Sequence, residues 1–292
     1  MNFALILLAS VAAAASSGSV RGFQTKLQAS SRQLQFFQFA YIFLDALIFF
    51  AAAGFILPKD PSVWLWAIAF ACCMFFASIG AAQSYLYGPM SLSSIIISCN
   101  VLLPIVAGCL FYQETLRTAH IFGILFLLAT VILSGIAPKG ARQEFHPIWF
   151  LYVLMAFLGN GFGAVILSSF GKIYQGVGNQ SFLAAAFLLS ALLLLSYYLI
   201  GGLRRKEISQ PIRPLPLFLV IVAIAAVTCY AVNAILLLLS GRMPAALLYP
   251  IYTGVSSLLT CLTSWLIFRE KMTKKKLCNI FLGLAAVILL NL

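Results

Sequence analysis

Long apolar segments occupy almost the whole chain, and only short stretches containing Pro, Gly and basic residues separate them. A membrane-spanning helix needs about 20 predominantly apolar residues. Helix-breaking and turn residues divide this chain into ten segments of that kind. Their expected ranges are 2–23, 35–57, 63–86, 90–112, 119–137, 147–170, 180–201, 215–239, 244–267 and 275–292. We therefore predict an all-α membrane protein with ten transmembrane helices.

The composition excludes a soluble domain of any size. Hydrophobic residues make up 63% of the 292 residues and charged residues 8%, whereas about 25% of the residues in a soluble domain are charged. The net charge is +12, but the basic residues lie in connectors, where they contact lipid headgroups. We expect the lipid bilayer as a partner, no nucleic acid, and a multi-pass protein of the cell membrane. A homodimer is compatible with the sequence.

One pattern occurs twice along the chain. An apolar helix ends near a single Glu, a large apolar residue follows two positions later, and another apolar helix completes that half. The two copies contain Glu114 and Glu270. They divide the chain into residues 1–138 and 147–292, with five segments each. Because an odd number of spans reverses the direction of the chain, the two units are expected to form inverted five-helix repeats, an architecture typical of transporters.

The basic residues also predict an orientation. The connectors after segments 1, 3, 5, 7 and 9 contain 14 Lys and Arg residues, whereas the opposite side contains four: Lys59, Arg117, Lys172 and Arg242. By the positive-inside rule, both termini lie on the non-cytoplasmic side.

The chain resembles the EamA-type members of the drug/metabolite transporter superfamily. The residues that carry the resemblance are Pro104, Glu114-Thr115-Leu116, Gly123, Glu270-Lys271-Met272 and Asn279. The chain departs from the family pattern where Gln113 and Arg269 replace the usual Gly, Thr115 and Lys271 the usual Arg, and Asn279 the second Gly. The resemblance implies a ten-helix transporter fold. It also implies cytoplasmic termini, which conflicts with the distribution of charge.

Asp45 is the one acidic residue in the middle of an expected span. Polar groups within the hydrocarbon are costly and are therefore candidate functional residues. Asp45 is a candidate for proton coupling, or for the counter-ion of a cationic substrate. The alternative is a structural acid that is hydrogen-bonded to a neighbouring helix. The resemblance implies that its segment is peripheral to the central cavity.

The resemblance places that cavity between segments 1, 3 and 4 of one half and 6, 8 and 9 of the other. Amides there can both donate and accept hydrogen bonds, and aromatic rings can pack against planar or cationic groups. The candidate substrate-binding residues are Gln83, Asn100, Asn160, Tyr230, Asn233, Tyr249 and Tyr252. Pro104 and Pro250, near Asn100 and Tyr249, can each leave a carbonyl free. For the amides, the alternative is an interhelical hydrogen bond that only packs helices.

Glu114 and Glu270 are predicted to be structural residues at helix ends. There, each can accept hydrogen bonds from the amides that open the next helix. Lys26 and Lys172 close equivalent spans and are expected to reach the membrane interface, or alternatively to steer anions at the mouths of the cavity.

The predicted function is secondary transport of a small polar or amphipathic metabolite by alternating access: an amino acid, nucleobase, sugar or drug-like amine. The sequence contains no P-loop, and its Cys and His residues have no metal-ligand spacing. We therefore expect no enzymatic activity, no cofactor and no metal. The alternatives are a channel, a non-transporting sensor or a membrane-embedded lipid-modifying enzyme.

Overall fold

A computed structural model describes residues 2–26, 30–87, 93, 96–115, 117–135, 148–176, 178–205 and 214–266, with residues 281–282, 285–286 and 289 near the C-terminus. These residues form helices and turns, without a β-strand among them. The elements are α1 (Asn2–Lys26), α2 (Ser31–Ala52), α3 (Pro61–Tyr87), the 3-10 turn η1 (Cys99–Val101), α5 (Leu102–Tyr112), α6 (Thr118–Gly135), α7 (Ile148–Tyr174), α8 (Asn179–Arg205), α9 (Leu215–Ser240) and α10 (Ala245–Leu266).

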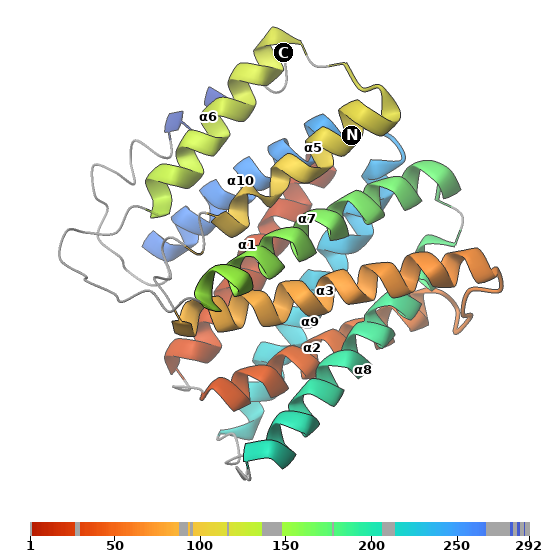
Figure 1. The fold of residues 1–292 in the computed structure, drawn as a ribbon, viewed down its shortest axis with the longest axis vertical. Helices are drawn as coiled ribbons and strands as arrows, with labels where there is room; N and C mark the ends of the chain where they lie inside the picture. Colours follow the sequence, from red (N-terminus) through yellow and green to blue (C-terminus); the bar gives the residue numbers. More distant parts are fainter. Residues whose placement is uncertain are drawn as a thin grey trace.

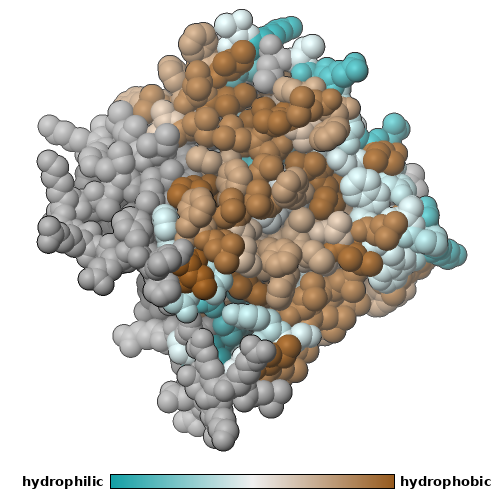
Figure 2. All heavy atoms as spheres, viewed as in Figure 1, coloured by the Kyte–Doolittle hydropathy of each residue, from teal (hydrophilic) through white to brown (hydrophobic). Residues whose placement is uncertain are grey.

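The fold is that of a multi-pass membrane protein. In the described part of the chain, six helices are long and apolar enough to cross a membrane: α1, α2, α3, α7, α8 and α9. Shorter apolar helices cover Ile96–Tyr112 and Ala245–Thr260. Figure 2 shows that the viewed face is dominated by hydrophobic residues, with hydrophilic residues mostly toward its margins. The predicted segment 275–292 lies almost entirely outside the described residues, so ten spans stay a prediction.

The start of α2 differs from the predicted range because a polar capping motif opens this helix. The Ser30 amide donates to Oε1 of Gln33 at 2.9 Å, and the Gln33 amide donates to the Ser30 hydroxyl oxygen at 3.3 Å. This capping box satisfies two backbone groups that would otherwise lack partners. The helix ends at Ala52, two residues before Gly54, whose φ of 68° is left-handed. The predicted range of 35–57 is therefore too late at both ends.

Helices from residues 2–135 pack along their lengths against helices from residues 148–266 (Figure 1). Helix α3 contacts α7, α1 contacts α9, and α2 contacts α8. Smaller contacts join α3 to α8, α2 to α9, α1 to α10, and α7 to η1 and α5, while α5 also contacts α10. Figure 1 shows α2 and α8 on one side of the bundle and α6 on the opposite side.

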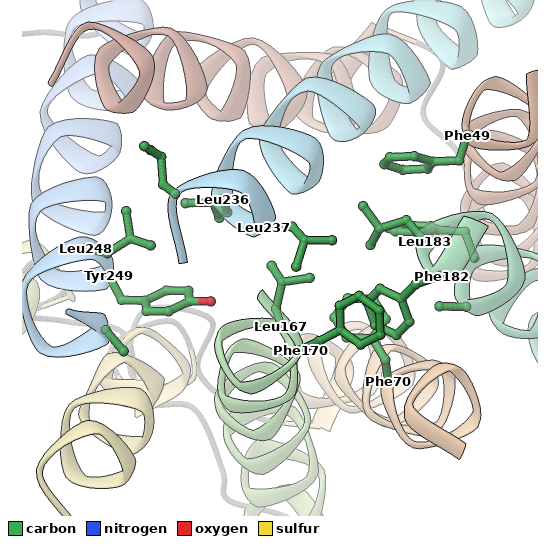
Figure 3. Packing of buried hydrophobic residues seen from close by; sticks show 14 of the residues in the cluster. Phe49, Phe70, Leu167, Phe170, Phe182, Leu183, Leu236, Leu237, Leu248 and Tyr249 are labelled. Carbon is green, nitrogen blue, oxygen red and sulfur yellow. The ribbon is translucent and has the colours of Figure 1, made fainter. Parts of the chain in front are cut away.

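Aromatic stacking fills the core between α3, α7 and α8. The rings of Phe170 and Phe182 stack with their centroids 3.9 Å apart, and Phe70 meets Phe182 edge-on at 6.0 Å (Figure 3). All three side chains are buried. Because lipid tails are as apolar as the core itself, such close packing, rather than the exclusion of water, holds membrane helices together.

Candidate functional site

Asp45 is fully buried in α2, and neither of its carboxyl oxygens makes a hydrogen bond of ordinary geometry among the described residues, although the Cys229 thiol of α9 lies close to them. Tyr41 lies one turn before it on the same helix, and Phe49 lies one turn after it. The Phe49 ring packs against Tyr230 of α9 at 4.6 Å and against Phe187 of α8 at 5.3 Å between centroids. The turn of α2 that follows Asp45 is therefore packed against aromatic side chains of α8 and α9.

Apart from Tyr41 on α2 itself, the polar side chains near Asp45 come from α9 and α10. The Cys229 side chain of α9 lies near those of Asp45 and Tyr41, and also near Tyr252 of α10. One turn further along α9, Nδ2 of Asn233 donates to the Cys229 carbonyl at 3.0 Å and to its Sγ at 3.5 Å. We call these five residues, Tyr41, Asp45, Cys229, Asn233 and Tyr252, the Asp45 cluster.

The Asp45 cluster contains one acid and four neutral polar groups, and within the described part of the chain Asp45 makes no ion pair. An ionised carboxylate buried without a partner is far more costly than a neutral acid. A carboxyl group in this position can take up or release a proton, or meet a cation, only when water or that cation reaches it. The chemistry that this arrangement permits is therefore exchange of a proton or a cation, linked to a change in exposure.

Three of the predicted substrate-binding residues that do not belong to the Asp45 cluster make their own hydrogen bonds, although Tyr249 lies near Tyr252. The Tyr249 hydroxyl donates to the Ala164 carbonyl of α7 at 2.8 Å, and its ring is buried beside Leu167 (Figure 3). Nε2 of Gln83 donates to the Tyr197 hydroxyl at 3.3 Å, which joins α3 to α8. Asn160 is exposed on α7, and its Nδ2 donates to the carbonyl of Ala156 in the same helix. The Gln83 contact matches the interhelical alternative to substrate binding, whereas the Asn160 hydrogen bond lies within α7.

The remaining candidates have different surroundings. Asn233, Tyr252 and Tyr230 lie at or beside the Asp45 cluster, as described above. Asn100 is half-buried in the 3-10 turn η1, which precedes α5. Pro104 follows four residues later and has no amide hydrogen to give to the Asn100 carbonyl. The helical stretch Ile96–Tyr112, within the helix predicted over 90–112, therefore contains one 3-10 turn just before the proline.

Glu114 binds two helices that lie far along the chain, α7 and α10. Its Oε1 and Oε2 accept hydrogen bonds from the amides of Ala245 and Ala246, at 2.9 and 2.8 Å, and Oε1 also pairs with the Lys172 ammonium of α7. These two amides open α10, whereas we expected the amides of the next helix along the chain, which is α6. The difference arises because α5 packs against α10.

Lys172 is held within the protein instead of extending freely to the interface. Besides its ion pair with Glu114, its ammonium lies 3.8 Å from the centroid of the Tyr112 ring. A cation over an aromatic face is stabilised by the quadrupole of the ring. Glu270 lies outside the described residues, as does the side chain of Lys26.

Two members of the Asp45 cluster were missed in the sequence. Tyr41 had a usable signal, because residues four apart share one face of a helix and Tyr41 precedes Asp45 by four positions. Cys229 had none. A lone cysteine in an apolar segment is ordinarily a small core residue, and only the packing of α9 on α2 brings it to Asp45.

Comparison with known proteins supports the fold alone. No protein-family model and no curated protein sequence matches the chain. A solved structure described only as "Crystal structure of protein" resembles it with a TM-score of 0.73 and 17% sequence identity. The alignment covers 99% of this chain and 94% of that chain. The arrangement of helices is thus shared over essentially the full length of both proteins.

Proposed function

We propose that this protein is a secondary transporter that moves a small polar or amphipathic metabolite across the membrane by alternating access. Its ten transmembrane helices would form two inverted five-helix repeats, as in the EamA-type drug/metabolite transporters that the sequence resembles. In such carriers the substrate site lies near the midplane between the repeats, and the two halves rock to expose it to each side in turn.

The observation that carries this proposal is a symmetry of the helix contacts. A contact between two helices has a counterpart between the two helices that match them in the other half. We match α1 with α7, α2 with α8, α3 with α9, and α5 with α10. Under this matching, the α1–α9 contact corresponds to the α7–α3 contact. In the same way, the α2–α9 contact corresponds to the α8–α3 contact. The contact of α1 with α10 corresponds to that of α7 with α5, and the α2–α8 and α5–α10 contacts correspond to themselves. All of these contacts are present, although the α7–α9 contact has no α1–α3 counterpart of similar extent among the described residues. The shared contacts support an approximate two-fold axis between the halves.

The Asp45 cluster supports coupling to a proton or a cation. Asp45 lies in the interface between the halves, because α2 belongs to the first half and its neighbours α8 and α9 to the second. A carboxyl group there changes its exposure when the halves move, and its protonation can therefore be linked to that movement. Amino acids, nucleobases, sugars and drug-like amines all remain candidate substrates.

The first test is a search for a ligand by thermal shift of the purified protein, using pooled amino acids, nucleosides, sugars and quaternary amines. A compound that binds only the folded state raises its stability. We expect a hit that is lost in Asn100→Ala and Asn233→Ala but kept in Ser196→Ala. Ser196 is an exposed residue of α8 whose hydroxyl donates only to its own helix, at Leu192.

The hit is then studied in proteoliposomes. We expect saturable uptake, and accelerated entry of labelled ligand when the vesicles are preloaded with the unlabelled compound. Rapid flux without this counterflow would replace the carrier with a channel. Binding without any flux would favour the sensor.

A further inference from the structure

The Glu114 carboxylate joins the ends of three helices at one end of the bundle. It follows the last turn of α5, accepts the first two amides of α10, and pairs with Lys172 in the last turn of α7. Its side chain is 8% exposed. We call Glu114, Lys172, Ala245 and Ala246 the Glu114 junction. A charge this well buried is stable only while its partners stay in place, because removal of one partner leaves the others unsatisfied.

The local backbone is arranged to direct Glu114 into this junction. Gln113 adopts a left-handed conformation with a φ of 51°, which ends α5 and turns the chain back. The Glu114 amide then donates to the Gly108 carbonyl at 3.2 Å. A side chain at Gly108 would collide with Oε2 of Glu114, so the glycine leaves the space into which the carboxylate folds.

The turn between α9 and α10 packs tightly against α7 at the same end. A Cβ atom on Gly241 would lie 2.7 Å from the Gly171 carbonyl oxygen, and the Ser240 hydroxyl donates to the Leu167 carbonyl at 3.3 Å. The start of α10 is thus held from two directions, by α7 through this turn and by Glu114 through its first amides.

The Glu114 junction connects the two halves of the protein. Glu114 belongs to residues 1–138, whereas Lys172, Ala245 and Ala246 belong to residues 147–292. If the halves rock against each other, this end can open only when the carboxylate separates from α10 and α7. The contacts that must break are two hydrogen bonds to a helix N-terminus and one ion pair, each strengthened by the charge of Glu114.

A second observation points to the same end of the protein. Ser168 lies one turn before Lys172 on α7, on the face that carries Lys172 and nearer to the middle of the helix. It is 2% exposed, and its hydroxyl has no hydrogen-bond partner among the described residues. Buried hydroxyl groups ordinarily have a partner. Water that enters from this end after the junction opens would supply one.

We propose that the Glu114 junction is a latch that closes this end of the protein, and that the end opens when Glu114 releases α10 and Lys172. The proposal rests on the proposed function, because alternating access is what requires each end to open. A purely structural Glu114 would hold its helices together in every conformation, whereas a latch releases them when this end opens.

The test uses Ser168→Cys as a reporter of opening, in the full-length protein in lipid nanodiscs. A membrane-impermeant maleimide is added, and modification of the peptide that contains residue 168 is followed by mass spectrometry, so that the native cysteines do not interfere. The reporter is combined separately with Glu114→Ala, Glu114→Gln and Lys172→Met. Ser62→Ala is the matched control, because it removes the 2.7 Å hydrogen bond to Tyr174 at the same end without touching the latch.

We expect labelling to be about tenfold faster in Glu114→Ala, since local opening becomes more frequent when its closing contacts are lost. Glu114→Gln and Lys172→Met are expected to give smaller increases, and Ser62→Ala none. An unchanged rate in Glu114→Ala would overturn the proposal. So would an equal acceleration in Ser62→Ala, because the effect would then not be specific to Glu114.

A second reporter separates opening from loss of the fold. Ser190 is fully buried in α8 and donates to the Ala186 carbonyl, so Ser190→Cys is expected to stay protected in every variant. If residue 190 is also labelled in Glu114→Ala, that variant no longer separates opening from unfolding. The test then uses Lys172→Met, in which Glu114 can still cap α10. Faster labelling of residue 168 alone then supports the latch, and no change overturns it.

Counterflow distinguishes failure of the latch from failure of the proposed function. We expect Glu114→Cys combined with Lys172→Cys, tethered by a flexible reducible bifunctional thiol reagent, to lose counterflow and to regain it after reduction. Counterflow that persists through tethering disproves the latch and leaves the transporter in place. Absence of counterflow in the wild type disproves the transporter, whereas the labelling rates still decide whether Glu114 closes this end.

Discussion

Gly80 of α3 lies directly against Ala156 of α7, so that a Cβ atom on Gly80 would be 2.6 Å from the Ala156 nitrogen. The relationship is reciprocal, because a Cβ atom on Gly159 of α7 would be 2.6 Å from the nitrogen of Ala77 in α3. Two glycines thus allow the backbones of α3 and α7 to touch. Small residues at such positions are a common means of packing helices in membranes, where burial of apolar surface contributes little.

We expect Gly159→Ala to lower the thermal stability of the protein in detergent. Overpacking of this kind costs about 1–3 kcal/mol, which exceeds the gain from the higher helix propensity of Ala. Gly18→Ala is the matched control, because nothing lies within 4 Å of the added atom. The control is expected to melt at or slightly above the wild-type temperature. If Gly159→Ala melts at the same temperature as Gly18→Ala, α3 and α7 can separate at no cost.

Gln113→Gly is expected to stabilise the protein. Gln113 ends α5 in a left-handed conformation that costs a non-glycine residue about 1 kcal/mol, and glycine is the residue most often found there. The usual glycine of the family pattern at this position therefore has a physical explanation. Tyr112→Gly, one position earlier and still within the helix, should lower the melting temperature. If both variants melt at a lower temperature, strain at Gln113 is not a significant factor.

Asp45→Asn is expected to abolish uptake driven by a pH gradient while leaving exchange at equal pH intact. Asn keeps the size of the side chain but cannot release a proton from a carboxyl group. The measurement is uptake of the identified substrate into proteoliposomes with and without a pH gradient. Asp60→Asn is the control, since Asp60 is an exposed acid before α3 that accepts a hydrogen bond from the Ser62 amide. Unchanged pH dependence in Asp45→Asn would remove Asp45 from the coupling mechanism.

Cysteine labelling in intact cells decides between the two orientations. Phe55 and Gln175 are exposed in the turns after α2 and α7, and Ser30 is exposed before α2. The positive-inside rule predicts that an impermeant maleimide labels Phe55→Cys and Gln175→Cys but leaves Ser30→Cys unmodified. The opposite pattern would favour the cytoplasmic termini implied by the family. Labelling of Phe55→Cys and Ser30→Cys from the same side would mean that α2 does not cross the membrane.

Hydrophobicity was sufficient to locate most helices, because a helix in lipid must satisfy its own backbone and needs an apolar surface along its whole length. Helices α1, α3, α7, α8, α9 and α10 begin and end within a few residues of the predicted ranges. Helix α2 was displaced because its first turn is polar and is stabilised by Ser30 and Gln33. Hydrophobicity carries no information about a capping box.

The candidate site could be predicted only in part, for a different reason. Asp45 was identifiable because an acid in an apolar segment is costly wherever the segment packs. Cys229 could not be identified, and Asn233, although a candidate, could not be placed beside Asp45, because both depend on which helix lies beside α2. Glu114 was recognised as a residue that binds helix amides, but those amides lie 131 and 132 positions further along the chain. Local sequence rules do not reach contacts at that separation.

The cap that Glu114 provides for α10 also bears on the biosynthesis of the protein. Glu114 leaves the ribosome long before Ala245, so the acceptor for the first amides of α10 is already in the membrane when that helix inserts. A fragment beginning at residue 147 would insert α10 without it, and would leave Lys172 without its counter-ion. Such a fragment is expected to be degraded when expressed alone and to persist when residues 1–138 are supplied as a separate polypeptide.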